Sequence, residues 1–242
     1  MAYQAIFQRN EIKYILTLEQ KARILQAMEE HMALDRYGRT TIRNLYFDTD
    51  NYRLIRHSIE HPVYKEKLRL RSYAQLQGDD AVFVELKKKY HSTVYKRRVS
   101  MPYCQALAWL CSRTVPAPPT QIGAEIDYFL DYYRSLQPVV FLSYEREAYY
   151  CKDGGPLRIT FDDHILCRQE ALSLEVPVYG VPLLESSKVL MEIKTSEAIP
   201  LWLTRVLTKE GLHKASFSKY GTAYQTMIFP KPEQHKGVYI YV

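Results

Sequence analysis

The feature that most constrains the fold is a short segment, residues 67–71 with the sequence KLRLR, in which basic and apolar residues alternate. In an extended strand Lys67, Arg69 and Arg71 lie on one face and the two leucines on the other, because successive strand side chains point to opposite faces. One such segment is explained by a solvated edge strand whose basic residues face water. Its recurrence along the chain requires another explanation.

Similar alternation occurs in several other segments. Their charged or polar faces comprise Glu85, Lys87 and Lys89 in residues 83–89, Arg158, Thr160 and Asp162 in residues 157–162, Glu192 and Lys194 in residues 190–194, and Glu11 and Lys13 near the start. Amphipathic helices are available to cover the apolar faces. If the sheet closes on itself, its charged side becomes a lumen. A dry core cannot hold so many unpaired cations, because burying an isolated charge is very costly, whereas a wet tunnel that holds a polyanion can.

We therefore predict an α+β protein built on an antiparallel β tunnel or barrel, with a charged lumen and helices packed outside. The chain of 242 residues is long enough for one such domain or for two small ones. The proline-rich residues 116–119 are the strongest break. Because the charged-strand pattern continues beyond them, we interpret them as a connector and predict a single domain over residues 1–242.

Periodicity and turn signals place the expected elements along the chain. Thr17 and Gln20 match a capping box at the start of a helix that we expect to run to about Ala33. The expected strands cover residues 3–16, 45–47, 63–74, 81–90, 93–101, 138–150 and the segment around Glu192, and further expected helices cover residues 102–111, 121–135 and 199–209. The three strands between residues 63 and 101 are joined by short polar links, as in an antiparallel meander.

Composition narrows the function classes. The net charge of +6 and the pI of about 9 indicate an anionic partner. Glycine is scarce, with 9 residues, and neither a P-loop nor a Rossmann fingerprint occurs, so phosphate binding must come from side chains. The four cysteines form no C-x-x-C pair and read as reduced thiols. Without a signal layout or an apolar run of about 18 residues, we expect a cytoplasmic protein, or one peripheral to the inner face of the membrane.

Rows of Lys and Arg suit phosphates, because Arg grips phosphate oxygens bidentately and Lys adds point charge. Phosphoryl transfer depends on positioning and charge neutralisation, and it generally needs a divalent metal that prefers carboxylate oxygens. The candidate ligands for Mn²⁺ or Mg²⁺ are Glu192, which is the strongest, Glu11, Glu85 and Asp162. Each of these acids also has a Lys or Arg on its own face, such as Lys194 beside Glu192. The residues alone therefore leave a structural ion pair open as the alternative.

Two other arrangements fit less well. The 21 tyrosines and the basic strands are compatible with single-stranded nucleic-acid binding through base stacking. Glutamates between the cations fit metal–phosphate chemistry better, so we do not expect nucleic acid as the partner. Ser216 and Ser218 beside Lys219 could form a Ser–Lys nucleophile, but Phe217 interrupts that arrangement.

An ordered set of motifs covers almost the whole chain: EIKY at 11–14, YFD at 46–48, KLRLR at 67–71, VELK at 84–87, YER at 144–146, RITFD at 158–162, MEIK at 191–194 and FSKYG at 217–221. In this order they resemble the VTC-type polyphosphate polymerase domains of the triphosphate tunnel metalloenzyme (CYTH-like) superfamily. The resemblance implies a tunnel of about eight antiparallel strands with helices outside. It also implies transfer of the γ-phosphate of ATP onto a growing inorganic polyphosphate chain, with Mn²⁺ or Mg²⁺ as cofactor.

By position, the resemblance implies phosphate-binding cations at Lys13, Arg69, Arg71, Lys87, Lys96, Arg146, Arg158 and Lys219, and a metal-binding carboxylate at Glu192. Among three consecutive cations, the resemblance assigns the phosphate contact to Lys96 and not to Arg97 or Arg98. Glu11, Glu85 and Lys194 join Lys96 as candidates for binding the cofactor and the nucleotide.

Two departures from the family pattern bear on function. Hydrolytic members open with Glu-x-Glu-x-Lys, whereas Arg9 replaces the first acid here, which weakens a tripolyphosphatase or nucleoside triphosphatase interpretation. Some polymerases carry a lysine where this chain has Ser216, and Lys214 is the candidate to supply that charge. A non-catalytic polyphosphate or nucleic-acid binding module is the further alternative. The membrane-spanning and phosphate-sensing domains of eukaryotic relatives are absent, so we expect any membrane partner to be a separate chain.

Overall fold

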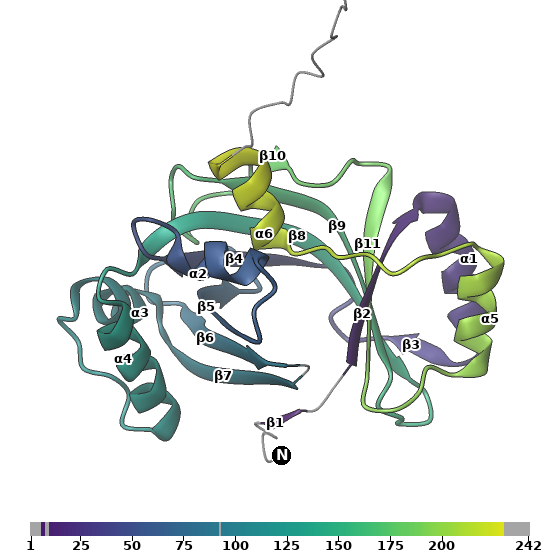
Figure 1. Ribbon diagram of the computed structural model, residues 1–242, viewed down its shortest axis with the longest axis horizontal. Coiled ribbons are helices and arrows are strands. Elements are labelled where there is room, and N and C mark those ends of the chain that lie inside the picture. Colours follow the sequence, from purple (N-terminus) through teal and green to yellow (C-terminus); the bar gives the residue numbers. More distant parts are fainter. Residues whose placement is uncertain (1–5, 8–9, 92, 230–242) are drawn as a thin grey trace, which may run out of the picture.

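The computed structural model describes residues 6–7, 10–91 and 93–229, and within them eleven strands form one antiparallel sheet (Figure 1). The strands are β1 (Ile6–Phe7), β2 (Asn10–Thr17), β3 (Met32–Leu34), β4 (Thr40–Asp48), β5 (Tyr64–Ser72), β6 (Ala81–Tyr90), β7 (Thr93–Pro102), β8 (Gln137–Cys151), β9 (Arg158–Arg168), β10 (Val181–Pro182) and β11 (Lys188–Thr195). The helices are α1 (Leu18–Met28), α2 (Arg53–Ile59), α3 (Tyr103–Leu107), α4 (Gln121–Tyr133), α5 (Leu201–Lys209) and α6 (Lys219–Ala223), with the π-helical turns η1 (Ala108–Ser112) and η2 (Tyr224–Ile228). The predicted α+β class is confirmed.

The sheet runs in the order β1-β7-β6-β5-β4-β8-β9-β11-β2, with β3 paired to β8 and β10 to β9. It curls so that β2 at one end and β6–β7 at the other lie on opposite sides of an opening (Figure 1). Among the described residues no backbone pairing joins these two ends, and the sheet has eleven strands rather than about eight. The antiparallel sheet is confirmed, and its closure into a barrel stays a prediction. We call the concave, charged side of the sheet the lumen.

The free edge of β2 is covered by an extended segment that leads into α6. The amide of Ala215 donates to the carbonyl of Lys13 at 2.8 Å, and the Lys13 ammonium donates to the carbonyl of Phe217 at 2.9 Å. Because this segment lacks the regular pairing of a strand, it satisfies only part of the backbone hydrogen-bonding groups at the edge of β2 and does not close the barrel.

Two apolar cores lie on the convex side of the sheet. One packs α3, η1 and α4 against β4–β6 and β8, with Leu68, Leu70, Trp109 and Phe129 among its buried residues. The other packs α1 and α5 against β2, β9 and β11, with Met191 as a central residue. These four helices and the leucines of residues 67–71 lie where the alternation predicted.

The remaining helices depart from the prediction that all helices lie outside. The third core packs α2, α6 and η2 against Tyr46, Val140 and Leu142, which belong to the lumen side of β4 and β8. The Asp48 carboxylate accepts from the amides of α2 and from the Tyr220 hydroxyl, the latter at 2.9 Å, and thereby holds α2 and α6 together. The two helices cover one end of the concave face, because the residues there are apolar instead of charged.

The first helix also differs from its expected length. The capping box is confirmed, because the Thr17 hydroxyl accepts from the Gln20 amide and the Gln20 side chain accepts from the Thr17 amide. The helix ends at Met28 rather than near Ala33, and Met32–Leu34 instead pairs with the end of β8 as β3. Tertiary pairing thus overrides the local helical pattern there.

Candidate active site in the lumen

Lumen-facing cations from β5 and β7 converge on the carboxylate of Glu85 in β6. Arg69 Nη2 lies 2.7 Å, Lys96 Nζ 2.9 Å and Arg98 Nε 2.6 Å from its oxygens, and Arg71 Nε is 3.9 Å away. Glu85 is 1% exposed. Burial alone raises the pKa of Glu85, but the four cations outweigh it and hold that pKa well below its usual value. We call these five residues the Glu85 cluster.

Arg71 connects this cluster to the centre of the lumen. Its Nε donates to Asn44 Oδ1 at 3.0 Å and its Nη2 donates to the Tyr144 hydroxyl at 2.9 Å. Burial alone raises the pKa of Tyr144, but Arg71, Arg146 and Lys219 around it lower that pKa to about 8. Tyr144 therefore lies between two groups of cations, both of which favour its ionised form.

The second group of cations is anchored on Asp162 in β9. Arg146 binds the Asp162 carboxylate through two hydrogen bonds of 2.6 Å, and Lys219 Nζ lies 2.6 Å from the same carboxylate. Asp162 is fully buried. Burial lowers the pKa of Lys219, but Asp162 and Glu192 outweigh it and raise the pKa above its ordinary value, so this ammonium stays charged.

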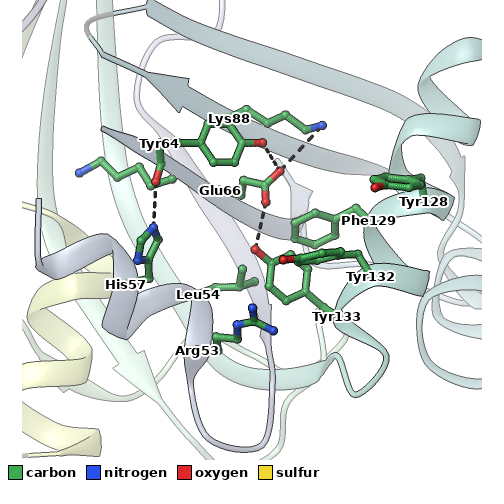
Figure 2. A pocket seen from close by; sticks show the side chains of 11 residues that line it. Arg53, Leu54, His57, Tyr64, Glu66, Lys88, Tyr128, Phe129, Tyr132 and Tyr133 are labelled. Carbon is green, nitrogen blue, oxygen red and sulfur yellow. Dashed lines mark hydrogen bonds and ion pairs between the residues drawn. The ribbon is translucent and has the colours of Figure 1, made fainter. Parts of the chain in front are cut away.

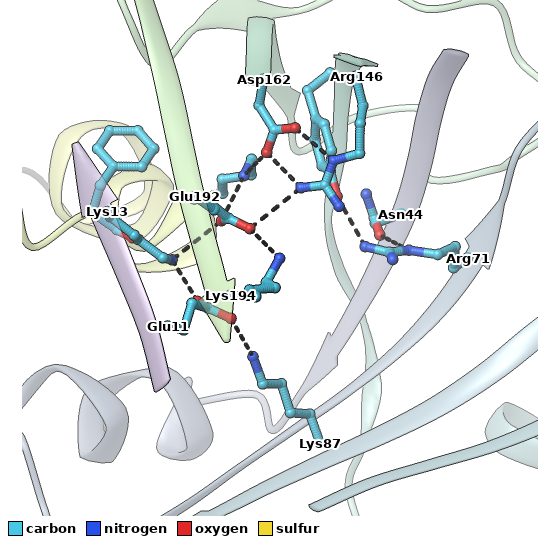
Figure 3. A network of polar contacts seen from close by, with 12 residues as sticks. Glu11, Lys13, Asn44, Arg71, Lys87, Arg146, Asp162, Glu192 and Lys194 are labelled. Atoms are coloured by element: carbon cyan, nitrogen blue, oxygen red, sulfur yellow. Dashed lines mark hydrogen bonds and ion pairs between the residues drawn. The ribbon is translucent and has the colours of Figure 1, made fainter. Parts of the chain in front are cut away.

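Glu192 in β11 lies beside Asp162 and is surrounded by cations (Figure 3). Its oxygens are 2.7 Å from Lys194 Nζ, 3.4 Å from Lys13 Nζ, 3.5 Å from Arg146 Nη2 and 3.6 Å from Lys219 Nζ. Burial alone raises the pKa of Glu192, but these cations hold it well below its usual range. We call the group consisting of Asp162, Glu192, Lys13, Arg146, Lys194 and Lys219 the Glu192 cluster.

A third set of cations has little carboxylate support. Lys65, Lys67, Lys87 and Lys89 line an open cavity of about 840 Å³, together with Lys13, Glu11 and the segment before α6. We call these four residues the lysine row. Burial and the neighbouring cations lower the pKa of Lys67 to about 7, and its ammonium donates to the neutral Ser218 hydroxyl at 3.1 Å.

Lys87 spans the opening between the two ends of the sheet. Its Nζ lies 3.9 Å from Glu11 Oε2 on β2, which joins β6 to β2 by side chains where the backbones do not pair (Figure 3). Burial alone raises the pKa of Glu11, but Lys87 and the nearby lysines Lys194 and Lys13 lower it to about 2.

The FSKYG motif positions the last lumen cation. Ser218 caps α6 by accepting from the Gly221 amide, and Lys219 begins the helix. A Cβ on residue 221 would lie 3.1 Å from Ser218 Oγ, which explains the glycine at that position. The motif therefore brings Lys219 onto Asp162 and leaves Ser218 facing Lys67.

Most of the sequence-predicted site residues lie together in the lumen. Arg158 lies on the same face of β9 as Asp162, opposite Lys194 of β11, but it is exposed at the start of the strand and forms no ion pair with the residues that the structure describes. Lys96 and Arg98 both point into the lumen, whereas Arg97 points outward to Glu125 on α4 at 2.7 Å. Lys214 lines the same cavity as Ser216, so it is placed where the missing lysine charge was expected.

Sequence reasoning did not single out Asn44, Tyr46, Tyr144 and Arg98 as site residues. Tyr46 belongs to the site because its hydroxyl accepts a hydrogen bond from Arg69 Nη1 at 2.9 Å. The signal that could have found Tyr46 and Tyr144 is their position within the YFD and YER motifs, on the same strand face as charged residues.

The carboxylates fit a metal that is held jointly with phosphates rather than by the protein alone. In the described part of the chain no three His, Cys, Asp or Glu side chains form a group that could hold a metal ion. Glu192 and Glu11 both approach Lys13 Nζ, at 3.4 and 3.3 Å, so they face a common point. Mg²⁺ is commonly bound by one or two carboxylates together with substrate phosphates, and this donor set matches that pattern.

Comparison with solved structures places this architecture in a known class. A Bacillus halodurans protein assigned as an adenylate cyclase superposes with a TM-score of 0.54 at 14% identity, covering 88% of this chain and 96% of that one. A Hippeastrum protein assigned as the adenylyl cyclase HpAC1, described as having a dominant triphosphatase activity, superposes with a TM-score of 0.50 at 15% identity, covering 89% and 94%. The fold is thus the CYTH-like triphosphate tunnel fold.

The model of the VTC domain matches residues 8–228, which is most of the chain. The chain belongs to the VTC domain family, and the resemblance read from the motifs is confirmed. No curated protein matches it. Among the described residues no helix is long and apolar enough to cross a membrane.

Proposed function

We propose that this protein is a polyphosphate polymerase that transfers the γ-phosphate of ATP onto a growing polyphosphate chain. A terminal oxygen of the chain attacks the γ-phosphorus, the bond from that phosphorus to the β–γ bridging oxygen breaks, and ADP leaves. The observation that carries the proposal is a lumen in which Lys and Arg from six strands and α6 outnumber the carboxylates, with Lys13 and the lysine row lining its open cavity.

The two clusters would supply the charge that such a transfer needs. Phosphoryl transfer is catalysed mainly by positioning and by neutralising charge on the phosphate oxygens. Arg69, Arg71 and Arg146 are oriented by buried acids or amides, so little reorganisation is needed when phosphate arrives. Glu192, with Glu11, would hold Mn²⁺ or Mg²⁺ beside these cations, and the metal would supply further charge neutralisation on the nucleotide phosphates.

The lysine row would bind the polyphosphate chain. Among the described residues Lys65, Lys67 and Lys89 have no carboxylate partner within 4.0 Å, and Lys87 has only Glu11 at 3.9 Å. Phosphate oxygens would therefore gain contacts there without displacing a short ion pair. Polyphosphate presents one negative charge per internal phosphate, so four lysines that pair across β5 and β6 would contact several phosphates of one chain.

The experiment is to incubate the purified protein with ATP and Mn²⁺ and to resolve the products on a gel. A ladder of polyphosphate with a matching amount of ADP is expected. Orthophosphate without a ladder would identify a tripolyphosphatase or nucleoside triphosphatase instead. Tight polyphosphate binding without metal-dependent turnover would identify a binding module, and either outcome would overturn the proposal.

A further inference from the structure

Figure 2 shows a second cavity, which shares Lys65 with the lumen cavity but has Glu66, from the other face of β5, in its wall. It has a volume of about 500 Å³, and it is formed by α2, α4 and the adjacent ends of β5 and β6. Glu66 belongs to it because it alternates with the lumen residues Lys65 and Lys67 along β5. Four tyrosines and a phenylalanine contribute rings to its wall: Tyr64, Tyr128, Phe129, Tyr132 and Tyr133.

The carboxylate of Glu66 is already occupied by protein donors. It accepts from the Tyr64 hydroxyl at 2.5 Å and from the Tyr133 hydroxyl at 3.1 Å, and Lys88 Nζ lies 3.8 Å away. Burial and Glu66 raise the pKa of Tyr133 above its ordinary value, so that hydroxyl keeps its proton. An organic cation would therefore find no free carboxylate here, and the role of Glu66 is to fix the rings.

The cations of this cavity, in contrast, are available to an anion. Arg53 forms no ion pair with the residues that the structure describes, and its guanidinium lies over the rings of Tyr132 and Tyr133, at 5.6 and 5.3 Å from their centres. His57 follows one turn later on the same face of α2, with its Nε2 3.0 Å from the Tyr64 carbonyl. Because the carbonyl of Tyr64 already occupies His57 Nε2, Arg53 is the group at this end of the cavity that a phosphate could bind.

Two exposed tyrosines line the cavity, and Arg53 covers one ring face of the second, Tyr132. Tyr128 and Tyr132 lie one turn apart on α4 and are 71% and 57% exposed. Exposed aromatic rings stack nucleobases of any kind, because every base has a π face. A planar ring that ends in a phosphate would therefore contact Tyr128 and Tyr132 with its ring and Arg53 with its phosphate, since Arg binds phosphate bidentately.

The geometry points to a nucleotide-binding site in this cavity, separate from the lumen, in which the base stacks on Tyr128 and Tyr132 and the phosphate binds Arg53. The volume lies within the range of about 300–1,000 Å³ that is typical of small-molecule sites. A nucleotide held there lies outside the lumen, so it binds without being consumed.

AMP serves as the probe and is titrated into the protein by calorimetry. The titration contains no metal, and an excess of inorganic tripolyphosphate occupies the lumen. We expect AMP to bind under these conditions, and Tyr132→Ala and Arg53→Ala each to weaken it about tenfold or more, from the loss of stacking or of the phosphate contact. The matched control is Tyr37→Ala, because Arg36 lies 4.7 Å over the exposed Tyr37 ring and neither residue lines this cavity. This control should bind AMP as the wild type does.

Three results would overturn the inference: no AMP binding in the presence of tripolyphosphate, binding that the Tyr132 and Arg53 variants leave unchanged, or equal binding of ribose 5-phosphate. The last result would show a phosphate site without base recognition. None of these results bears on polymerisation, which the product gel tests separately.

Discussion

Two regions of the lumen hold cations in opposite ways. In the Glu85 and Glu192 clusters every cation lies within 4.0 Å of a buried carboxylate. The pKa values of Arg69, Arg146 and Lys219 lie above their ordinary values, whereas burial lowers the pKa of Lys96 to about 8 despite its contact with Glu85. In the lysine row the pKa values of Lys65, Lys67 and Lys87 lie below theirs, because burial disfavours the charge and neighbouring cations repel it, in Lys87 against a partial offset from Glu11. The clusters are stable without ligand, whereas the row is stabilised by an anion.

This difference separates two roles that net charge alone does not distinguish. Cations that are fixed by buried acids keep their geometry in the free protein, which is what transition-state stabilisation requires. Cations that are held near one another without acids cost stability in the free protein, and they gain the most from phosphate binding. Substitutions in the two regions should therefore affect activity and stability differently.

The largest effect is expected from the arginines of the Glu85 cluster. Arg69→Ala and Arg71→Ala should each lower polymerisation about 10²-fold or more, from lost charge contacts in the transition state. Repulsion among like charges alone predicts unchanged or higher stability for such variants. The contacts with buried Glu85 reverse that expectation, so we expect each variant to lose about 1–3 kcal/mol of stability.

Initial rates on the product gel and thermal unfolding measure these two effects. Arg97→Ala is the matched control, because Arg97 lies on the same strand as Lys96 but pairs with Glu125 outside the lumen. It should retain activity within about threefold, as a surface substitution does. An active Arg69→Ala/Arg71→Ala double variant would rule out a role for this cluster in catalysis.

Glu192→Gln is expected to have the next largest effect and to separate a metal ligand from an ion-pair partner. The amide keeps the shape but loses the negative charge that a hard cation prefers, so turnover should fall about 10²-fold and recover in part at high Mn²⁺. Polyphosphate binding should persist or tighten, because one repulsive charge is gone.

Stability does not discriminate between these two roles, because Glu192 contacts four cations and its loss destabilises the cluster in either case. The discriminating measurement is a Mn²⁺ titration of activity. Glu125→Gln serves as the control outside the lumen. An unshifted Mn²⁺ midpoint in Glu192→Gln would show that Glu192 only pairs with Lys194 and its other neighbours.

The sequence was sufficient to predict the alternating faces, because alternation is a local property of each strand. The placement of Arg69, Arg71, Glu85 and Glu192 on the side opposite the buried leucines follows from it directly. The sequence could not show which cation forms an ion pair with which acid. The Lys219–Asp162 contact joins residues 57 positions apart, and it depends on the path of the segment before α6.

The closure of the sheet was not predictable for the same reason. Whether β2 pairs with β7 or is covered by residues 213–218 depends on curvature accumulated over the whole sheet. The position of α2 and α6 on the concave side was missed because their apolar residues look like those of any outer helix. The third apolar core and the contact between Asp48 and Tyr220, which lie 172 positions apart, fix them there.

The smallest expected effect concerns the lysine row and depends on pH. The pKa of Lys67 is about 7 in the folded protein and 10.5 ordinarily, so between these values the unfolded chain binds more protons than the folded one. The contribution of Lys67 to the stability of the free protein therefore rises with pH over this interval. Polyphosphate binding should show the opposite trend, because a bound anion favours the charged ammonium and binding takes up a proton above pH 7.

Lys67→Gln tests this opposition. The variant should be more stable than the wild type near pH 6, where charged Lys67 is repelled by Lys65 and Lys87, and its affinity for tripolyphosphate should depend less on pH. Proton uptake by one group changes affinity by at most about tenfold per pH unit, so the two proteins should diverge by about that factor between pH 6 and 8.

Tyr144, whose pKa of about 8 also affects anion binding in this range, is removed as a cause by repeating the titration in Tyr144→Phe. Lys209→Gln on the exposed face of α5 supplies the control. Parallel pH profiles for Lys67→Gln and the wild type would show that the lysine row is as well compensated as the clusters, and the distinction between the two regions would fail.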